Sequence, residues 1–156
     1  MEVYGVDMGI LLPSFIGTHS SEYAAMCKRN PTRFRTCAVE TELRLAAIRG
    51  KEEWTIEKAL KEHEGYFSGP DKEWFCGIGE FSPGSMGCLR SRPTKMERFK
   101  EWCQIAEFCI NYDIPCYTHE FTSYGMEDHL TMMACVCTKY PSFKLIIAHG
   151  GGSAED

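Results

Sequence analysis

Short apolar segments alternate with helical patterns along the whole chain, and no other feature of the sequence constrains the fold as strongly. Strands are predicted at residues 8–13, 34–39, 75–80, 114–119 and 144–149. Helices are predicted at 20–29, at 41–64 as one or two helices interrupted at Gly50, at 95–112 and at 127–139. This alternation predicts an α/β fold with a parallel sheet. The sheet would be an open, doubly wound one or part of a barrel, and periodicity alone does not choose between them.

Two of the predicted helices have a clear apolar face. The start of the helix at 95–112 is marked by Thr94 and Glu97, which have the spacing of a capping box. Its inward residues are expected to be Phe99, Trp102, Cys103, Ala106, Cys109 and Ile110. The helix at 127–139 should end before Pro141. Its inward residues are expected to be Leu130, Met133, Ala134 and Cys137.

Composition narrows the class of protein. With 156 residues, 44% of them hydrophobic, the chain can form one domain with a substantial core. The net charge of -5 is spread without a basic block, which argues against nucleic-acid and membrane-surface binding and favours small polar metabolites as partners. The early apolar stretch "MGILLPSFI" is too short to span a bilayer and follows acidic rather than basic residues. The sequence therefore predicts a cytoplasmic protein, and a homo-oligomer is compatible with it.

Nine cysteines are many for this length, but no two have the spacing of a zinc ribbon or a thioredoxin-like motif. An odd count without a secretory signal indicates reduced thiols. Cys103, Cys109 and Cys116 fall in predicted core positions, where cysteine behaves as a small hydrophobic residue. Cys135 and Cys137 could bind a metal in principle, but nothing nearby in the sequence completes a zinc ligand set.

Three metal-capable residues end successive predicted strands. Glu80 ends the third strand, His119 the fourth and His149 the fifth, with the length of one βα unit between each pair. In a barrel all carboxyl ends of the strands lie on one face, so these side chains would converge. Glu, His and His suit zinc or a similar divalent ion. The glycines at 150–152 would leave room for a ligand to approach His149.

Each of the three residues also has a structural interpretation when taken alone. Glu80 could cap the following helix or face solvent. His119 could be a core histidine that bonds to Glu120 or a backbone carbonyl, and His149 a turn residue after a buried strand. Their shared position favours a common site. The remaining histidines are expected to be solvated or hydrogen-bonded and outside that site: His19, His63 and His129.

Several segments resemble a known family, namely "VYGVDMGILLPS", "NPTRFRTCAV", "FCGIGEFS", "IPCYTHE" and "YPSFKLIIAHGGG". In order and spacing, the chain is similar to the amidohydrolase-related family of the metal-dependent amidohydrolase superfamily, which includes aminocarboxymuconate-semialdehyde decarboxylase. The "GIGE" and "IPCYTHE" segments are also similar to the TatD-type nucleases of that superfamily. The resemblance covers nearly the whole chain.

The resemblance implies a (βα)8 TIM barrel in which the five strands are the second to the sixth. It implies that His119 is a metal ligand on the fifth strand. His149 would be a second ligand in two-metal members, or the catalytic acid/base in one-metal members. Glu80 matches the position that bridges two metals in some members. The implied chemistry is metal-dependent hydrolysis or decarboxylation of a small molecule, with a divalent metal ion, zinc, as cofactor; nucleic acid would be a substrate only in a TatD-like member.

The chain departs from the family pattern in two places. No HxH pair of the kind that the family's first strand supplies occurs in it, and it stops before an eighth strand with its aspartate. We therefore expect residues 1–156 to be a single incomplete barrel domain, an internal fragment that is inactive alone. Two alternatives to a metal-dependent enzyme are a fragment without any activity and a non-catalytic, flavodoxin-type open α/β domain. The latter predicts a glycine-rich loop after the first strand, where "SFIGTHS" has one glycine.

Overall fold

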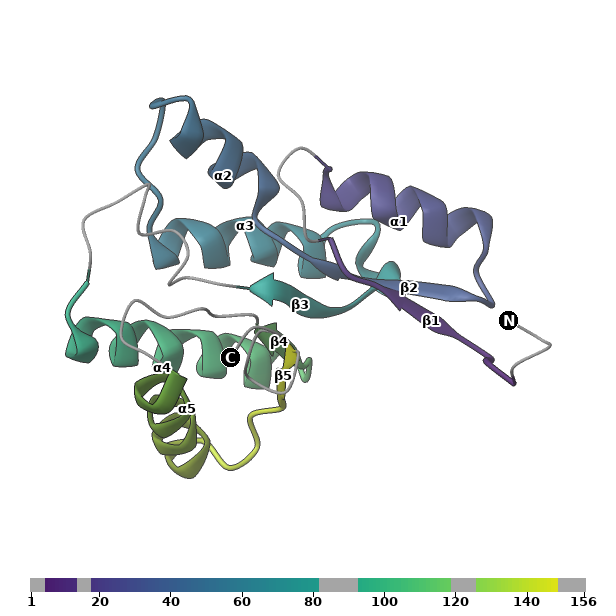
Figure 1. Ribbon diagram of the computed structural model, residues 1–156. Coiled ribbons are helices and arrows are strands. Elements are labelled where there is room, and N and C mark those ends of the chain that lie inside the picture. The colour runs from purple at the N-terminus through teal and green to yellow at the C-terminus, as the bar shows by residue number, and fades with distance from the viewer. Residues whose placement is uncertain (1–4, 14–17, 82–92, 119–125, 149–156) are drawn as a thin grey trace.

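Strands and helices alternate along the chain in the order that the sequence predicts (Figure 1). In the computed structural model the described residues are 5–13, 18–81, 93–118 and 126–148. The strands are β1 (Gly9–Leu11), β2 (Phe34–Ala38), β3 (Phe75–Phe81), β4 (Cys116–Thr118) and β5 (Leu145–Ile147). The α-helices are α1 (Ser20–Arg29), α2 (Thr41–Ile48), α3 (Ile56–Ser68), α4 (Lys95–Asn111) and α5 (Met126–Lys139). A short 3-10 helix, η2 (Lys72–Trp74), leads into β3.

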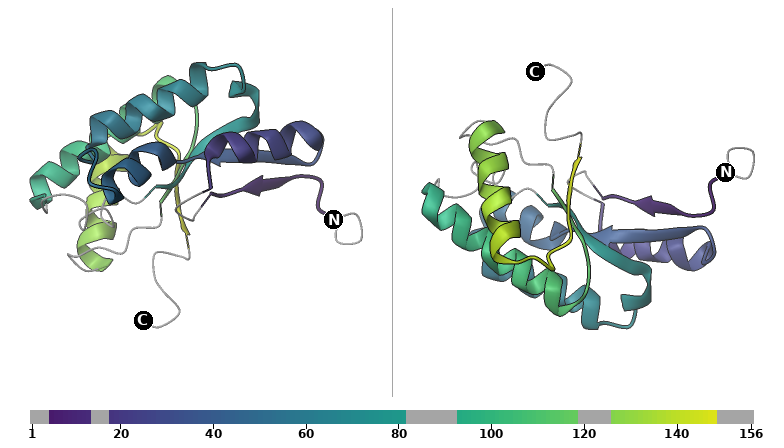
Figure 2. Two further views of the ribbon diagram at one scale, coloured as in Figure 1. Left: turned by 90° about the horizontal axis from the view of Figure 1, so that it is seen from above. Right: turned by 90° about the horizontal axis from the view of Figure 1, so that it is seen from below.

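The five strands form one parallel sheet in chain order, β1-β2-β3-β4-β5. The sheet curls into half of a barrel, and the described helices lie on its outer side (Figure 2). Sequential parallel strands with helices on one side confirm the α/β fold and the curled arrangement. A flavodoxin-type sheet has the order 2-1-3-4-5 and helices on both faces, so that alternative is wrong for the fold.

Glycines in β3 allow β4 to approach it closely. Gly79 has φ +134°, a conformation that side chains rarely adopt. A Cβ at this position would lie 2.7 Å from the Cβ of Tyr117 in β4. A Cβ at Gly77 would lie 2.9 Å from the carbonyl oxygen of Pro115. Only glycine fits these two sites without moving the neighbouring strand.

The hydrophobic core lies between the sheet and the helices. Its largest fully buried side chains include Trp54, Trp102, Phe81, Ile78 and Ile105. Burying a side chain of this size contributes about 1.5–3 kcal/mol. Three cysteines predicted as core residues are buried as expected, namely Cys103, Cys109 and Cys116. In the described ranges, no helix has both the length and the apolar character needed to cross a membrane.

The start and the apolar face of α4 are confirmed. The amide of Glu97 donates to the Thr94 hydroxyl at 3.2 Å, and the amide of Thr94 donates to the Glu97 carboxylate at 2.7 Å, which completes the capping box. Because this box satisfies two backbone N–H groups, it fixes the first turn of the helix. The six predicted inward residues are buried or half-buried.

The predicted inward face of α5 is partly wrong. Met133 is buried as predicted, but Leu130 and Ala134 are exposed. The buried face also contains His129 and Val136, so it is rotated by about one residue. The ring of His129 lies 6.3 Å from that of Trp102 in α4. Burial, followed by the nearby Arg98 charge, lowers the pKa of His129, so a neutral imidazole packs here as an aromatic ring.

Candidate functional site at the carboxyl end of the sheet

The carboxyl ends of β3, β4 and β5 lie level with one another. Phe81 pairs with Thr118, and Thr118 pairs with Ile147. Glu80 directly precedes the first of these residues and is half-buried. His119 directly follows the second and His149 follows the third by two positions, but both histidines lie outside the described residues. Their convergence with Glu80 therefore stays a prediction.

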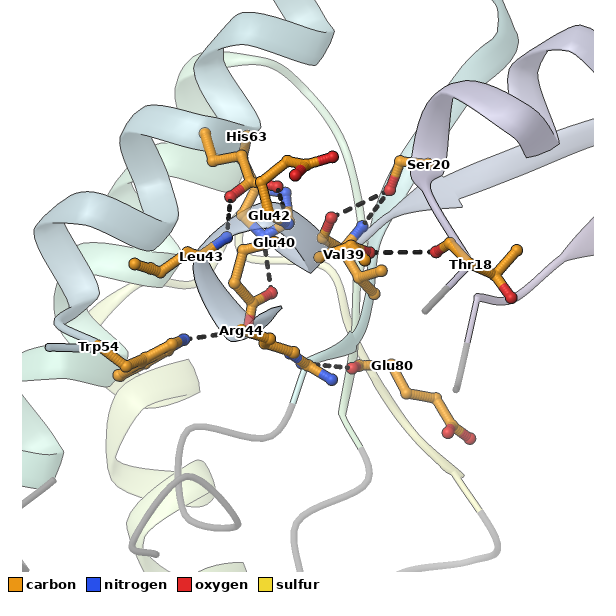
Figure 3. Close-up of polar contacts among 12 residues, drawn as sticks. Thr18, Ser20, Val39, Glu40, Glu42, Leu43, Arg44, Trp54, His63 and Glu80 are labelled. Carbon is orange, nitrogen blue, oxygen red and sulfur yellow. Dashed lines mark hydrogen bonds and ion pairs between the residues drawn. The ribbon is translucent and has the colours of Figure 1, made fainter. Parts of the chain in front are cut away.

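The equivalent end of β2 carries a buried acid that the sequence analysis did not single out. Glu40 follows β2 by two residues and has no exposed surface. Its Oε1 accepts hydrogen bonds from Arg44 Nε at 2.7 Å and from Trp54 Nε1 at 3.3 Å. Its Oε2 lies 3.4 Å from Nε2 of His63 (Figure 3). We call these four residues, Glu40, Arg44, Trp54 and His63, the Glu40 cluster.

The Glu40 cluster is connected to Glu80 through Arg44. Nη2 of Arg44 donates to the backbone carbonyl of Glu80 at 3.3 Å. Figure 3 shows the Glu80 carboxylate pointing away from Arg44. The guanidinium is almost fully buried. It carries several N–H donors in one plane, so it bonds to Glu40 and to the end of β3 at the same time. Arg44 thus joins the carboxyl ends of β2 and β3.

Glu40 is ionised at neutral pH despite its burial. Desolvation alone would raise the pKa of its carboxyl group, but the Arg44 charge and then His63 lower this pKa to about 2. An isolated buried carboxylate would instead take up a proton. The two neighbouring basic side chains therefore make a buried negative charge stable at this end of the sheet.

The structure corrects the expectation that the His63 side chain is solvated or hydrogen-bonded. It lies on α3 and is fully buried, with its ring 5.5 Å from that of Phe81 and 6.3 Å from that of Phe108. Within the described part of the chain, neither ring nitrogen makes a hydrogen bond of good geometry, although Nε2 faces Glu40. The interior role was missed because a lone histidine on a helix carries no sequence signal of tertiary burial.

Neighbouring elements hold the end of β2 in place. The Ser20 hydroxyl, at the start of α1, donates to the carbonyl of Val39 at 2.9 Å and accepts from its amide at 3.0 Å. The carboxylate of Glu62 on α3 accepts from the amides of Glu42 and Leu43 at 3.1 and 2.9 Å, and so satisfies the first turn of α2. These bonds fix the backbone on both sides of Glu40.

The described residues at this face do not by themselves form a metal-ligand set. Among the described residues, no three His, Cys, Asp or Glu side chains are grouped so as to hold an ion. Glu40 is engaged with Arg44, Trp54 and His63. Cys135 and Cys137 lie on the outer helix α5, exposed and half-buried. The predicted ligand set of Glu80, His119 and His149 thus stays a prediction, because two of its members lie outside the described residues.

Comparison of the chain with models of protein families, with curated proteins and with solved structures found no match. The resemblance to the amidohydrolase-related family therefore stays a prediction from the sequence. The same sequence criterion that selected Glu80 would also have found Glu40, because Glu40 is an acid directly after a predicted strand. Its spacing of four residues from Arg44 was a second available signal.

Proposed function

We propose that this chain belongs to a metal-dependent hydrolase or decarboxylase of the amidohydrolase type that acts on a small molecule. The ion would be held at the carboxyl face by Glu80, His119 and His149. One observation carries the proposal: β3, β4 and β5 end level, at Phe81, Thr118 and Ile147, and each of these ends has one of the three residues within two positions of it in the sequence. Strands that end level deliver neighbouring side chains to one opening.

The proposed architecture is part of a (βα)8 barrel. Five parallel strands in sequential order, with helices on one side of a curled sheet, correspond to five of its eight strands. In such barrels the active site is built from the loops at the carboxyl ends of the strands. Glu80 and the Glu40 cluster both lie at that end.

In the proposed mechanism, a divalent ion, when bound, supplies a water whose pKa falls from about 15.7 to near 7. His119 would hold the ion. His149 would either hold it too or move a proton between water and substrate, since its ordinary pKa of about 6.5 suits that transfer. Glu80 would add a negative charge to the site. Arg44 would fix the backbone from which Glu80 projects.

Metal analysis of histidine variants tests this proposal. We would load the purified chain with Zn²⁺, remove free ion, and measure retained zinc by mass spectrometry. Replacing His119 with alanine should weaken zinc binding by roughly tenfold or more, because a ligand is lost. Replacing His149 should either do the same or leave zinc in place. His19→Ala is the matched control, because His19, the residue before α1, pairs with Glu42 of the outer helix α2.

Turnover separates the two roles of His149. Candidate activities are loss of carbon dioxide from aromatic and enoic acids and hydrolysis of amides and esters. In a protein that carries the complete barrel, retained zinc with abolished turnover in His149→Ala would assign this residue as the acid/base, because such a group acts on the transition state without holding the ion. Undiminished zinc in both histidine variants would overturn the proposal.

A further inference from the structure

Two cysteines lie side by side on neighbouring strands of the sheet. Cys37 is in β2 and Cys76 is in β3. Thr36 pairs with Phe75, whereas Cys37 pairs with Gly77, so two residues of β3 lie opposite one residue of β2. Such a bulge changes the direction of side chains on the strand that contains it. Cys76 is the extra residue of β3 at this bulge, and its thiol lies within hydrogen-bonding reach of the Cys37 thiol.

The backbone geometry at the bulge suits a disulfide. Neighbouring strands run about 4.7–4.9 Å apart. A disulfide needs a Cα separation of about 4.4–6.8 Å, which adjacent positions on paired strands provide. Gly77 also leaves space for the Cys37 sulfur, because a Cβ at Gly77 would lie 3.3 Å from that Sγ. The pair therefore needs no large backbone movement to join.

The two thiols differ in accessibility and in ionisation. Cys37 is fully buried, whereas Cys76 is half-buried. Hydrogen bonding with Cys37, and to a smaller extent the Arg35 charge, lowers the pKa of Cys76, while the same pairing raises the pKa of Cys37. Arg35 is held over the ring of Trp74 at 5.2 Å and donates to the carbonyl of Pro31 at 2.7 Å. Cys76 is also the more accessible of the two thiols, so it is the one that meets a dissolved oxidant first and acts as the nucleophile of the pair.

We propose that Cys37 and Cys76 form a reversible disulfide when the protein reacts with hydrogen peroxide. The Cys76 thiolate attacks one peroxide oxygen, the O–O bond breaks, and the released hydroxide takes a proton to become water. Cys76 is then a sulfenic acid. The Cys37 sulfur attacks the Cys76 sulfur and displaces hydroxide, which leaves as a second water with the Cys37 proton. Two thiols are oxidised and one peroxide is reduced, and a thiol reductant reverses the product.

Peptide mapping of the whole chain tests this inference independently of metal binding. The protein is treated with one equivalent of hydrogen peroxide, remaining thiols are alkylated, and the chain is digested without reductant. We expect one cross-linked peptide pair joining residues 37 and 76, lighter by two hydrogen atoms than the separate peptides, and its loss after dithiothreitol. Cys135→Ser is the matched control, because Cys135 is exposed on α5 and should leave the cross-link unchanged.

Variants of the pair identify the order of the two steps. Cys37→Ala keeps a small apolar residue at the buried position and should leave Cys76 as a sulfenic acid that dimedone traps. Cys76→Ser should prevent oxidation of Cys37. Circular dichroism before treatment establishes that each variant is folded. The inference is overturned if the wild-type chain keeps both thiols free after peroxide has oxidised Cys135, or if Cys37 and Cys76 cross-link mainly to other cysteines.

Discussion

The buried negative charge of Glu40 depends on the side chains around it. Its carboxylate has no exposed surface, and its charge is stabilised by Arg44, Trp54 and His63. Desolvating an ion costs several kcal/mol, which the surrounding bonds must offset. Removing one partner leaves the other charges buried without compensation. The Glu40 cluster is therefore sensitive to small chemical changes.

Replacing Glu40 with glutamine removes the negative charge while keeping the shape of the side chain. We expect Glu40→Gln to lower the free energy of unfolding by about 3–5 kcal/mol, because Arg44 stays buried beside a neutral group. Urea denaturation followed by circular dichroism measures this. Glu64→Gln, an exposed change on α3, should alter the same free energy by less than about 0.5 kcal/mol. A loss below 1 kcal/mol in the Glu40 variant would contradict the assignment of a paired buried charge.

The acid stability of the chain should also depend on Glu40. Its pKa falls from the ordinary 4.5 to about 2 on folding, so between these values the unfolded chain binds a proton that the native chain does not. The contribution of Glu40, about 3 kcal/mol at most, is thus full above pH 4.5 and is lost as the pH falls toward 2. Stability curves of wild type and Glu40→Gln should converge over this window. Parallel curves would show that Glu40 does not titrate in it.

At the scale of elements, the boundaries of strands and helices followed from local patterns. The five strands and the helices at 20–29, 95–111 and 126–139 lie within a few residues of their predicted limits, because hydrophobic period, caps and turn residues are local signals. The buried face of α5 was not predictable in the same way. It depends on contact with Trp102 of α4, which places His129 inward.

Two glycine substitutions should have opposite effects on stability. Gly79→Ala places a Cβ 2.7 Å from that of Tyr117 at a positive φ, so we expect it to destabilise the chain by about 1–3 kcal/mol or more. Gly65→Ala lies in α3, where a Cβ meets no atom within 4 Å, so it should stabilise the chain by about 0.5–1 kcal/mol. Thermal unfolding compares the two. Equal shifts would contradict the close approach of β3 and β4.

At the scale of the whole molecule, the curled sheet has two edges. Among the described residues β1 pairs only with β2, and β5 only with β4. Apolar side chains are exposed at both edges, with Ile10 in β1 46% exposed and Ile146 in β5 40% exposed. Unpaired edges with apolar side chains tend to recruit other strands. Parallel pairing was predictable from the βα alternation, but the choice of a sequential strand order over a doubly wound one, and the convergence of side chains from different strands, depend on tertiary geometry.

We expect the chain to associate through these edges at increasing concentration. Ile10→Lys should shift the distribution toward monomer, because charged residues on an edge strand oppose pairing. Ile48→Lys, at the end of α2, is a control of almost equal exposure at 47% and should leave association unchanged. Light scattering over a concentration series measures both. A monomer at every concentration would contradict the role of the edges.

X-ray absorption at the zinc K edge, on the zinc-loaded chain, tests the central claim most directly. Ligation by Glu80, His119 and His149 predicts a first shell of nitrogen and oxygen at about 2.0–2.2 Å, with outer-shell scattering from imidazole rings. In His119→Ala the imidazole contribution should fall by about half where His149 also holds the ion, and disappear where His149 only moves a proton. A zinc–sulfur shell at about 2.3 Å would instead place the ion on cysteines and contradict the carboxyl-face site.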